Sequence, residues 1–120
     1  MLVEQSILKG VKIIRPEIYH DERGSFLELF KSSNFKKFGL PSKFVQENQV
    51  FSRQGVLRGL HYQLNYPQGK LVRCLIGAIF DVVVDIRKGS PDFAKFTIIE
   101  IYLKTSQKDF TFNRGVFDER

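Results

Sequence analysis

The chain has 120 residues with a formal net charge of +6, and 42% of its residues are hydrophobic and 27% charged. This length suits a single domain over residues 1–120 with its own core, and no apolar stretch approaches the roughly 18 residues of a membrane span. The basic residues are scattered rather than gathered in a stripe, so the charge indicates no nucleic-acid partner.

The first third of the chain predicts a hairpin followed by a short helix. Apolar residues at 11–14 predict a strand that ends at Pro16, and residues 20–24 form a turn in which Gly24 is suited to a positive φ. Residues 26–30 predict the returning strand.

The stretch SSNFKKFG, at 32–39, predicts one or two helical turns. Ser32 or Ser33 is the expected N-cap, and Gly39 is the expected stop. Phe35 and Phe38 are three residues apart, so they are expected to share a face.

The rest of the chain is rich in β-forming residues. Residues 44–51 have β-prone ends and a polar middle, 71–86 are the strongest β signal with a break at Gly77, and 96–103 predict a further strand. In FDVVVDIR the alternation places Phe80, Val82, Val84 and Ile86 on one face and Asp81, Val83, Asp85 and Arg87 on the other. About seven strands with little helix predict an all-β sandwich or barrel.

One cysteine, Cys74, lies in the apolar run LVRCLIGAIF and is expected to be a small buried hydrophobe. A single cysteine offers no disulfide framework, and the N-terminus lacks the pattern of a signal peptide. We therefore expect a cytoplasmic protein.

Several polar residues lie in or beside the predicted strands: Arg23, Glu28, Gln46, Asn48, Arg58, His61, Lys70 and Asp81. Each of them alone fits a surface or hydrogen-bonded residue. Together they contain what proton removal next to a ketone requires, because a base must take the proton and a cation must stabilise the enolate. His61 can accept a proton near neutral pH, and Lys70 or Arg58 can face an oxyanion or a phosphate.

The spacing within GVLRGLHYQ, at 55–63, raises a geometric difficulty. Arg58 and His61 are three residues apart, so a regular strand would send their side chains to opposite faces. Gly59 lies between them, and a bulge there would re-aim one side chain. We predict a backbone irregularity at Gly59 if both residues serve one pocket.

Other chemistries have less support in the sequence. The chain has two histidines, His20 and His61, which are too few and too far apart for the histidine-rich site of a metal-dependent cupin. The sequence contains no Gly-rich phosphate loop and no G-x-S-x-G motif.

Five blocks in order, DERGSFLELF, FVQEN, VLRGLHYQ, QGKLVR and FDVVVDIRKGSPDF, resemble the dTDP-4-dehydrorhamnose 3,5-epimerase family over about residues 10–103. The resemblance implies a cupin-like jelly roll (a double-stranded β-helix) and a homodimer, with no metal or organic cofactor. It also implies epimerisation at C3 and C5 of a dTDP-4-keto-6-deoxy sugar in dTDP-L-rhamnose biosynthesis. On this interpretation 55–63 is a barrel strand at the floor of the nucleotide-sugar pocket.

The resemblance also assigns roles to the polar residues. His61 would be the catalytic base, and Lys70 would stabilise the enolate at O4. The substrate-binding residues would be Arg23, Glu28, Gln46, Asn48 and Arg58. Arg23 and Glu28 would contact the dTDP part across the dimer interface, and Asp81 would be a supporting charge near the lysine.

The C-terminal stretch departs from the family pattern. FNRGVFDER, at 112–120, stands where the family carries a motif like IPRGFAHGF, and the family's general-acid tyrosine and the acidic partner of its base have no counterpart. We therefore expect a jelly roll that is incomplete at its C-terminus. A 3-epimerase and a non-catalytic, degenerate nucleotide-sugar binding module remain alternatives, and Tyr62, Tyr66 and Tyr102 are possible substitute acids.

Overall fold

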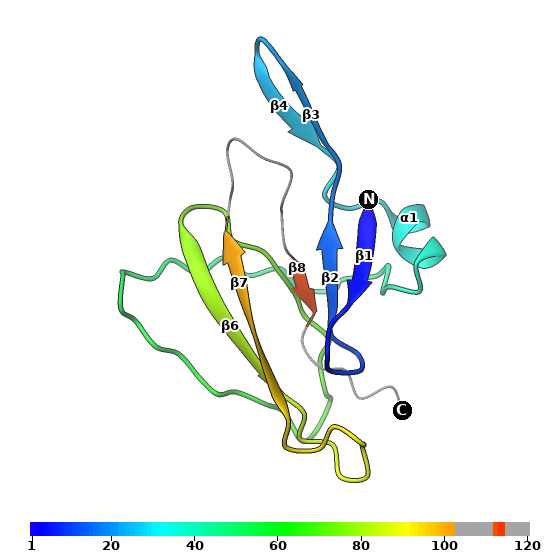
Figure 1. The fold of residues 1–120 in the computed structure, drawn as a ribbon, viewed down its shortest axis with the longest axis vertical. Helices are drawn as coiled ribbons and strands as arrows, with labels where there is room; N and C mark the ends of the chain where they lie inside the picture. Colours follow the sequence, from blue (N-terminus) through cyan, green and yellow to red (C-terminus); the bar gives the residue numbers. More distant parts are fainter. Residues whose placement is uncertain (103–111, 115–120) are drawn as a thin grey trace.

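The computed structural model of the chain describes residues 1–102 and 112–114. In this part the chain forms eight strands and one short helix, arranged in three small sheets (Figure 1). The elements in chain order are β1 (Leu2–Gln5), β2 (Lys12–Arg15), β3 (Ile18–Asp21), β4 (Gly24–Leu27), α1 (Ser32–Lys37), β5 (Leu71–Val72), β6 (Ala78–Val84), β7 (Phe96–Tyr102) and β8 (Phe112–Arg114). The prediction of an all-β fold is confirmed, and within the described residues no helix is long and apolar enough to cross a membrane.

The largest sheet has four antiparallel strands in the order β1-β2-β8-β5. Strand β8 lies between two strands that are far from it in sequence, with Ile13 opposite Asn113 and Leu71 opposite Arg114. The sheet therefore depends on pairing between distant parts of the chain. Ile14 of β2 lies in a small core with Phe35 and Leu40, which fixes α1 against this sheet.

The longest pairing is the β6–β7 hairpin, in register from Ala78 opposite Tyr102 to Val84 opposite Phe96. The predicted alternation is confirmed, because Val83 is buried whereas Phe80 is 74% exposed. The buried face is the one that carries the acidic residues. It is buried because Ile99 and Ile101 of β7 pack with Val83 in a second core, formed with Leu8, Val11 and Cys74.

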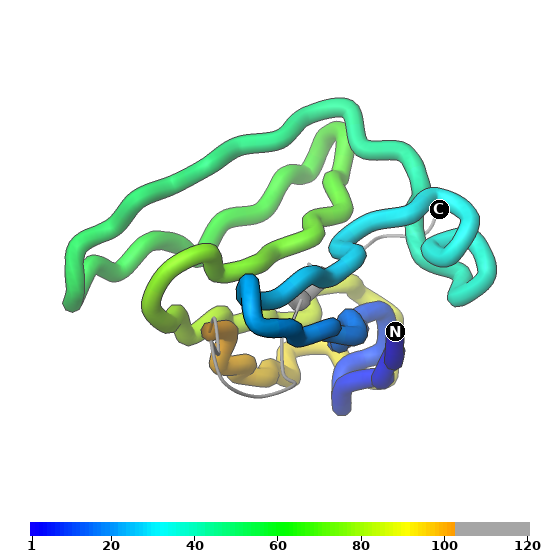
Figure 2. Tube along the Cα trace, turned by 90° about the horizontal axis from the view of Figure 1, so that it is seen from above, coloured from blue at the N-terminus to red at the C-terminus, as the bar shows by residue number. Residues whose placement is uncertain are grey.

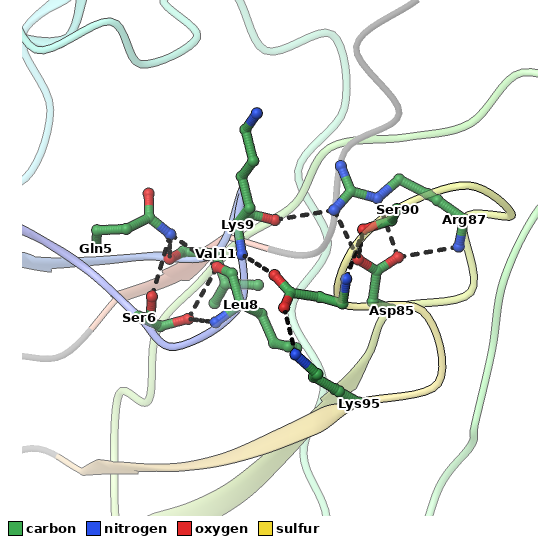
Figure 3. Close-up of polar contacts among 10 residues, drawn as sticks. Gln5, Ser6, Leu8, Lys9, Val11, Asp85, Arg87, Ser90 and Lys95 are labelled. Carbon is green, nitrogen blue, oxygen red and sulfur yellow. Dashed lines mark hydrogen bonds and ion pairs between the residues drawn. The ribbon is translucent and has the colours of Figure 1, made fainter.

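A polar network joins the turn after β6 to the turn between β1 and β2 (Figure 3). The carboxylate of Asp85 is fully buried and accepts hydrogen bonds from the Arg87 backbone N, from Arg87 Nε and Nη2, and from Ser90 Oγ. Arg87 Nη2 also donates to the carbonyl oxygen of Lys9 at 3.1 Å, and the backbone N of Lys9 donates to Asp92 Oδ2 at 3.3 Å. We call these residues, Lys9, Asp85, Arg87, Ser90 and Asp92, the clasp. It connects segments nearly 80 residues apart.

The β3–β4 hairpin projects away from the rest of the molecule (Figure 1). It pairs from Ile18 opposite Leu27 to Asp21 opposite Gly24, and Gly24 has a φ of +135° as predicted. The returning strand begins two residues before the predicted range and ends at Leu27.

Helix α1 lies within the predicted range, but its predicted N-cap is wrong. The N-cap residue is Lys31, without a side-chain cap, so the serines lie inside the helix. Gly39 follows the helix with a φ of +65°, which confirms it as the stop. Phe35 is 1% exposed and Phe38 is 38% exposed, because Phe38 is already the C-cap, and the prediction of a shared face is wrong.

Residues 38–70 form one long excursion without helix or strand (Figure 2). The strand predicted over 44–51 and the barrel strand predicted over 55–63 are therefore wrong for the described structure. A strand needs a hydrogen-bonded neighbour. Among the backbone bonds of the described residues, this excursion makes one within itself beyond the helix end, from Val56 N to Arg53 O at 3.3 Å.

Candidate functional site

Two of the predicted binding residues belong to the projecting hairpin. Arg23, at its tip, donates from Nη2 and Nε to Asp21 Oδ2 at 2.6 and 3.1 Å, and these hydrogen bonds lower the pKa of the Asp21 carboxyl. Glu28 follows β4 and accepts a hydrogen bond from Asn34 Nδ2 at 2.7 Å. The guanidinium and the carboxylate are both exposed, so both are available to a ligand.

The hairpin also carries a tyrosine that the predicted site does not include. A hydrogen bond with Glu17 raises the pKa of the Tyr19 hydroxyl, and the charge of Glu28 contributes in the same direction. Glu28 therefore lies close enough to Tyr19 to act on it electrostatically. The signal in the sequence was the alternation of Glu17 with Tyr19 on one strand and of Phe26 with Glu28 on the other.

Five predicted residues lie on the long excursion, and Lys70 is its last residue. Gln46 Nε2 donates to Asn48 Oδ1 at 3.2 Å, so these two amides are neighbours. Arg58 Nε donates to Ser52 Oγ at 3.0 Å. The fourth residue, His61, is exposed and makes no hydrogen bond or ion pair within the described part of the chain.

The backbone irregularity predicted at Gly59 is present. Its φ is +104°, a conformation that residues with a side chain rarely adopt. A Cβ atom at this position would lie 3.7 Å from Nδ1 and 3.9 Å from Cε1 of His61. The glycine thus lies directly against the imidazole ring of His61. The irregularity is therefore a positive φ in a segment without strands, and the predicted β-bulge is wrong.

Lys70 borders a shallow apolar depression between the four-stranded sheet and the segment after α1. The depression is lined by Ile14, Phe35, Leu40, Pro41, Phe44, Lys70 and Leu71. The aromatic rings of Phe30, Phe35 and Phe44 pack edge to face beside it, with centroids 4.7 to 6.4 Å apart. The lysine is the charged group at the rim of this apolar surface.

Asp81 lies on β6 opposite Ile99 and is partly buried. It belongs to the same face of β6 as Val83 and Asp85, the buried face. The structure therefore distributes the predicted site residues over the hairpin region, the long excursion and β6. Gln46 and Asn48 are in direct contact with each other. No group of three or more His, Cys, Asp or Glu side chains within residues 1–102 could hold a metal ion.

Comparison with known proteins identifies one family. A family model described as dTDP-4-dehydrorhamnose 3,5-epimerase matches residues 5–116. The chain is 51% identical over 94 residues to the dTDP-4-dehydrorhamnose 3,5-epimerase of Methanothermobacter thermautotrophicus, covering 78% of this chain and 51% of the relative. It is 48% identical over 103 residues to that of Shigella flexneri, covering 84% of this chain and 57% of the relative. The chain thus spans about half the length of these relatives.

Solved structures agree with this match. The dTDP-4-dehydrorhamnose 3,5-epimerase from Sulfolobus tokodaii superposes with a TM-score of 0.82 at 38% identity, over 96% of this chain and 64% of that one. The dTDP-6-deoxy-D-glucose-3,5-epimerase from Legionella pneumophila, solved in complex with dTDP-4-keto-L-rhamnose, superposes with a TM-score of 0.81 at 40% identity, over the same shares of the two chains. The cupin-like all-β fold predicted from the sequence is confirmed by these neighbours.

Proposed function

Because the chain belongs to the dTDP-4-dehydrorhamnose 3,5-epimerase family, we propose that it epimerises C3 and C5 of dTDP-4-keto-6-deoxy-D-glucose in dTDP-L-rhamnose biosynthesis. The observation that carries this proposal is the family match over residues 5–116. That range includes both the LRGLHYQ block with His61 and the QGKLVR block with Lys70. The same match supports a single cupin-like epimerase domain over residues 1–120.

His61 is the proposed base. Its neutral imidazole removes the proton from a carbon next to the C4 ketone, and the electron pair of the broken C–H bond forms the enolate. The ammonium group of Lys70 stabilises the negative charge that develops on O4. Water donates a proton to the same carbon on the opposite face, which gives the epimer, restores the ketone and leaves hydroxide to be neutralised by the protonated His61. The exposed position of His61 against Gly59 leaves its ring free to reach a substrate.

The remaining predicted residues bind the substrate in this proposal. Arg23 and Arg58 attract the diphosphate, because guanidinium groups form paired hydrogen bonds with phosphate oxygens. The neighbouring amides of Gln46 and Asn48 offer donors and acceptors to the sugar hydroxyls. Asp81 is a supporting charge. Glu28 contacts the nucleoside part.

The proposed assembly is a homodimer in the cytoplasm, with the β3–β4 hairpin reaching the partner's site. The projection of this hairpin away from its own subunit supports the proposal. The diphosphate-sugar substrate is an intracellular activated sugar, and the chain needs no organic cofactor for proton exchange at a carbon next to a ketone.

Proton NMR in D₂O tests the proposed reaction. The chain is incubated with dTDP-4-keto-6-deoxy-D-glucose, and the C3 and C5 proton signals are followed over time. We expect both signals to disappear with the unmodified chain and to persist, or decay about 10² to 10⁴ times more slowly, with His61→Ala. The His61→Ala variant also identifies exchange caused by a contaminating epimerase.

The same spectra distinguish the alternative functions. Exchange at C3 alone would make the chain a 3-epimerase. Binding of the substrate without exchange at either carbon would make it a non-catalytic nucleotide-sugar binding module, and the absence of both binding and exchange would refute the proposal. Circular dichroism of each variant ensures that the compared chains are equally folded.

A further inference from the structure

We infer that Phe44 is a positioning residue for the proposed reaction. Its ring fixes the start of the long excursion beside Lys70, so that the amide pair of Gln46 and Asn48 and the ammonium group of Lys70 act on one sugar. This inference rests on the proposed function and deepens it, because Phe44 lies outside the predicted set and acts through Lys70.

The long excursion has little of its own to hold its shape. Residues 43–68 are all exposed, and among the described backbone bonds the excursion makes one within itself beyond the helix end, from Val56 to Arg53. Segments with few buried contacts and few backbone hydrogen bonds open at a low free-energy cost. The positions of Gln46 and Lys70, near the two ends of the excursion, therefore depend on where those ends are attached.

Phe44 attaches the start of the excursion to the body of the molecule. Its ring packs edge to face on Phe30 and Phe35, with centroids 5.5 and 6.4 Å away. Phe35 is fully buried in the core that joins α1 to the large sheet. Phe44 is 44% exposed, whereas the next residue, Val45, has no covered surface. The attachment therefore lies at the ring of Phe44.

The end of the excursion is attached to the same core. Leu71, which directly follows Lys70, packs against the cluster that contains Phe35. Phe44, Lys70 and Leu71 line the same apolar depression. A lysine packs its methylene stem on apolar surface and keeps its ammonium group in water, so this depression can orient Lys70 without neutralising it. Both ends of the excursion are thus fixed at one place.

The two attached ends carry different parts of the proposed chemistry. Gln46 follows Phe44 by two residues and donates a hydrogen bond to Asn48 at 3.2 Å, and Lys70 precedes Leu71. An anchor at Phe44 therefore places the amides that bind the sugar hydroxyls beside the ammonium group that stabilises the enolate. A misplacement of about 1 Å can cost a reaction two orders of magnitude in rate. Release of one end should therefore slow the reaction although Phe44 touches no substrate.

The first experiment measures proton exchange in D₂O for three variants, with each rate divided by the folded fraction from circular dichroism. We expect Phe44→Ala to slow exchange at C3 about 10- to 100-fold. Phe44→Leu keeps an apolar side chain in the depression and should recover most of the rate. Val45→Ala, which truncates the neighbouring exposed side chain, is the matched control and should leave the rate unchanged.

A double-mutant cycle separates positioning from a general structural effect. Lys70→Met removes the ammonium group and keeps an apolar stem. In the Lys70→Met background, Phe44→Ala should change the exchange rate by no more than about twofold, because the group that Phe44 positions is absent. A slowing of the same size in both backgrounds would overturn the inference.

Trypsin cleavage gives a readout that does not depend on activity. Loss of the two ring contacts should raise the initial rate of cleavage after Lys70 about 5- to 150-fold in Phe44→Ala, because cleavage follows the population of the opened end. Cleavage after Arg53, in the exposed middle of the excursion, should stay the same, and mass spectrometry of the fragments distinguishes the two sites. Unchanged cleavage after Lys70 would overturn the attachment.

The unmodified chain distinguishes failure of this inference from failure of the proposed function. If it exchanges protons and Phe44→Ala exchanges them equally fast, the positioning role is wrong and the proposed function stands. If the unmodified chain exchanges no protons, the proposed function is wrong, and the role of Phe44 in the reaction is overturned with it.

Discussion

Replacement of Asp85 by asparagine tests whether the clasp stabilises the fold. Asp85 Oδ2 accepts hydrogen bonds from Arg87 Nη2 and Ser90 Oγ, both at 2.7 Å, and Oδ1 accepts bonds from Arg87 N at 2.9 Å and Nε at 3.0 Å. In Asp85→Asn an NH₂ group replaces one of these oxygens. The two hydrogen-bond donors that contacted that oxygen then face another donor, and the charge of Arg87 loses its partner carboxylate.

The magnitude follows from burial. Removing one partner of a buried ion pair costs about 3–5 kcal/mol. Asp85 has no exposed surface, whereas the Arg87 side chain is 26% exposed and keeps some hydration. We therefore expect Asp85→Asn to lower the free energy of unfolding by roughly 3 kcal/mol, near the lower end of that range. Urea denaturation followed by circular dichroism at pH 7 measures the loss.

The effect should depend on pH in a defined direction. Hydrogen bonds from Arg87 hold the pKa of the Asp85 carboxyl far below its usual range. Burial raises this pKa, and the hydrogen bond from Ser90 lowers it further. A lowered pKa in the folded state contributes stability that is fully present above the unfolded value of about 3.9, and that is lost as the pH falls through the folded pKa. The difference between the unmodified chain and Asp85→Asn should be constant from neutral pH to about pH 5 and should shrink below about pH 4.

The hairpin offers a matched control. Asp21 and Arg23 have the same spacing and share two of the bonds, from Arg23 N to Asp21 Oδ1 at 2.8 Å and from Nη2 to Oδ2 at 2.6 Å. Asp85 accepts a further bond from Ser90 Oγ. Arg23 is 86% exposed there, so Asp21→Asn should cost far less than Asp85→Asn. Equal losses in the two variants, or a loss at Asp85 that is the same at pH 3 and pH 7, would refute the argument from burial.

Phe35→Ala should lower the free energy of unfolding by about 3–5 kcal/mol, because it leaves a cavity between α1 and the large sheet. In urea denaturation, Phe35→Ala should lose more stability than the control variant Phe38→Ala, which truncates a partly exposed side chain. Gly10→Ala should cost about 1–2 kcal/mol through its φ of +92° alone, since no atom lies within 4 Å of a Cβ there, and a stability unchanged on substitution would contradict this positive φ. Gly59→Ala should slow proton exchange in the D₂O experiment, because a residue with a Cβ is strained at a φ of +104° and a backbone shift there moves His61. An exchange rate equal to that of the unmodified chain would show that this conformation does not set the position of the ring.

The sequence predicted which residue types belong to the candidate site, but it did not predict how their side chains are placed in space. The sequence blocks around His61 and Lys70 lie within the family match, so these two residues could be identified from the sequence alone. The contacts of Arg58 with Ser52, and the position of Gly59 against the histidine ring, depend on backbone dihedrals that the sequence does not encode by periodicity.

The sequence by itself determined the local features: the alternation along β6, the positive φ of Gly24, the glycine that ends α1, and membership of the family. The first three follow from steric limits on single residues and from side-chain periodicity, which act over a few residues. Membership of the family follows from the match over residues 5–116. Only the tertiary structure decided which face of β6 is buried, that β8 pairs between β2 and β5, and that residues 38–70 form no strand. Each of these depends on a partner distant in sequence, because a strand exists through the hydrogen bonds of its neighbour and a face is buried only by what packs against it.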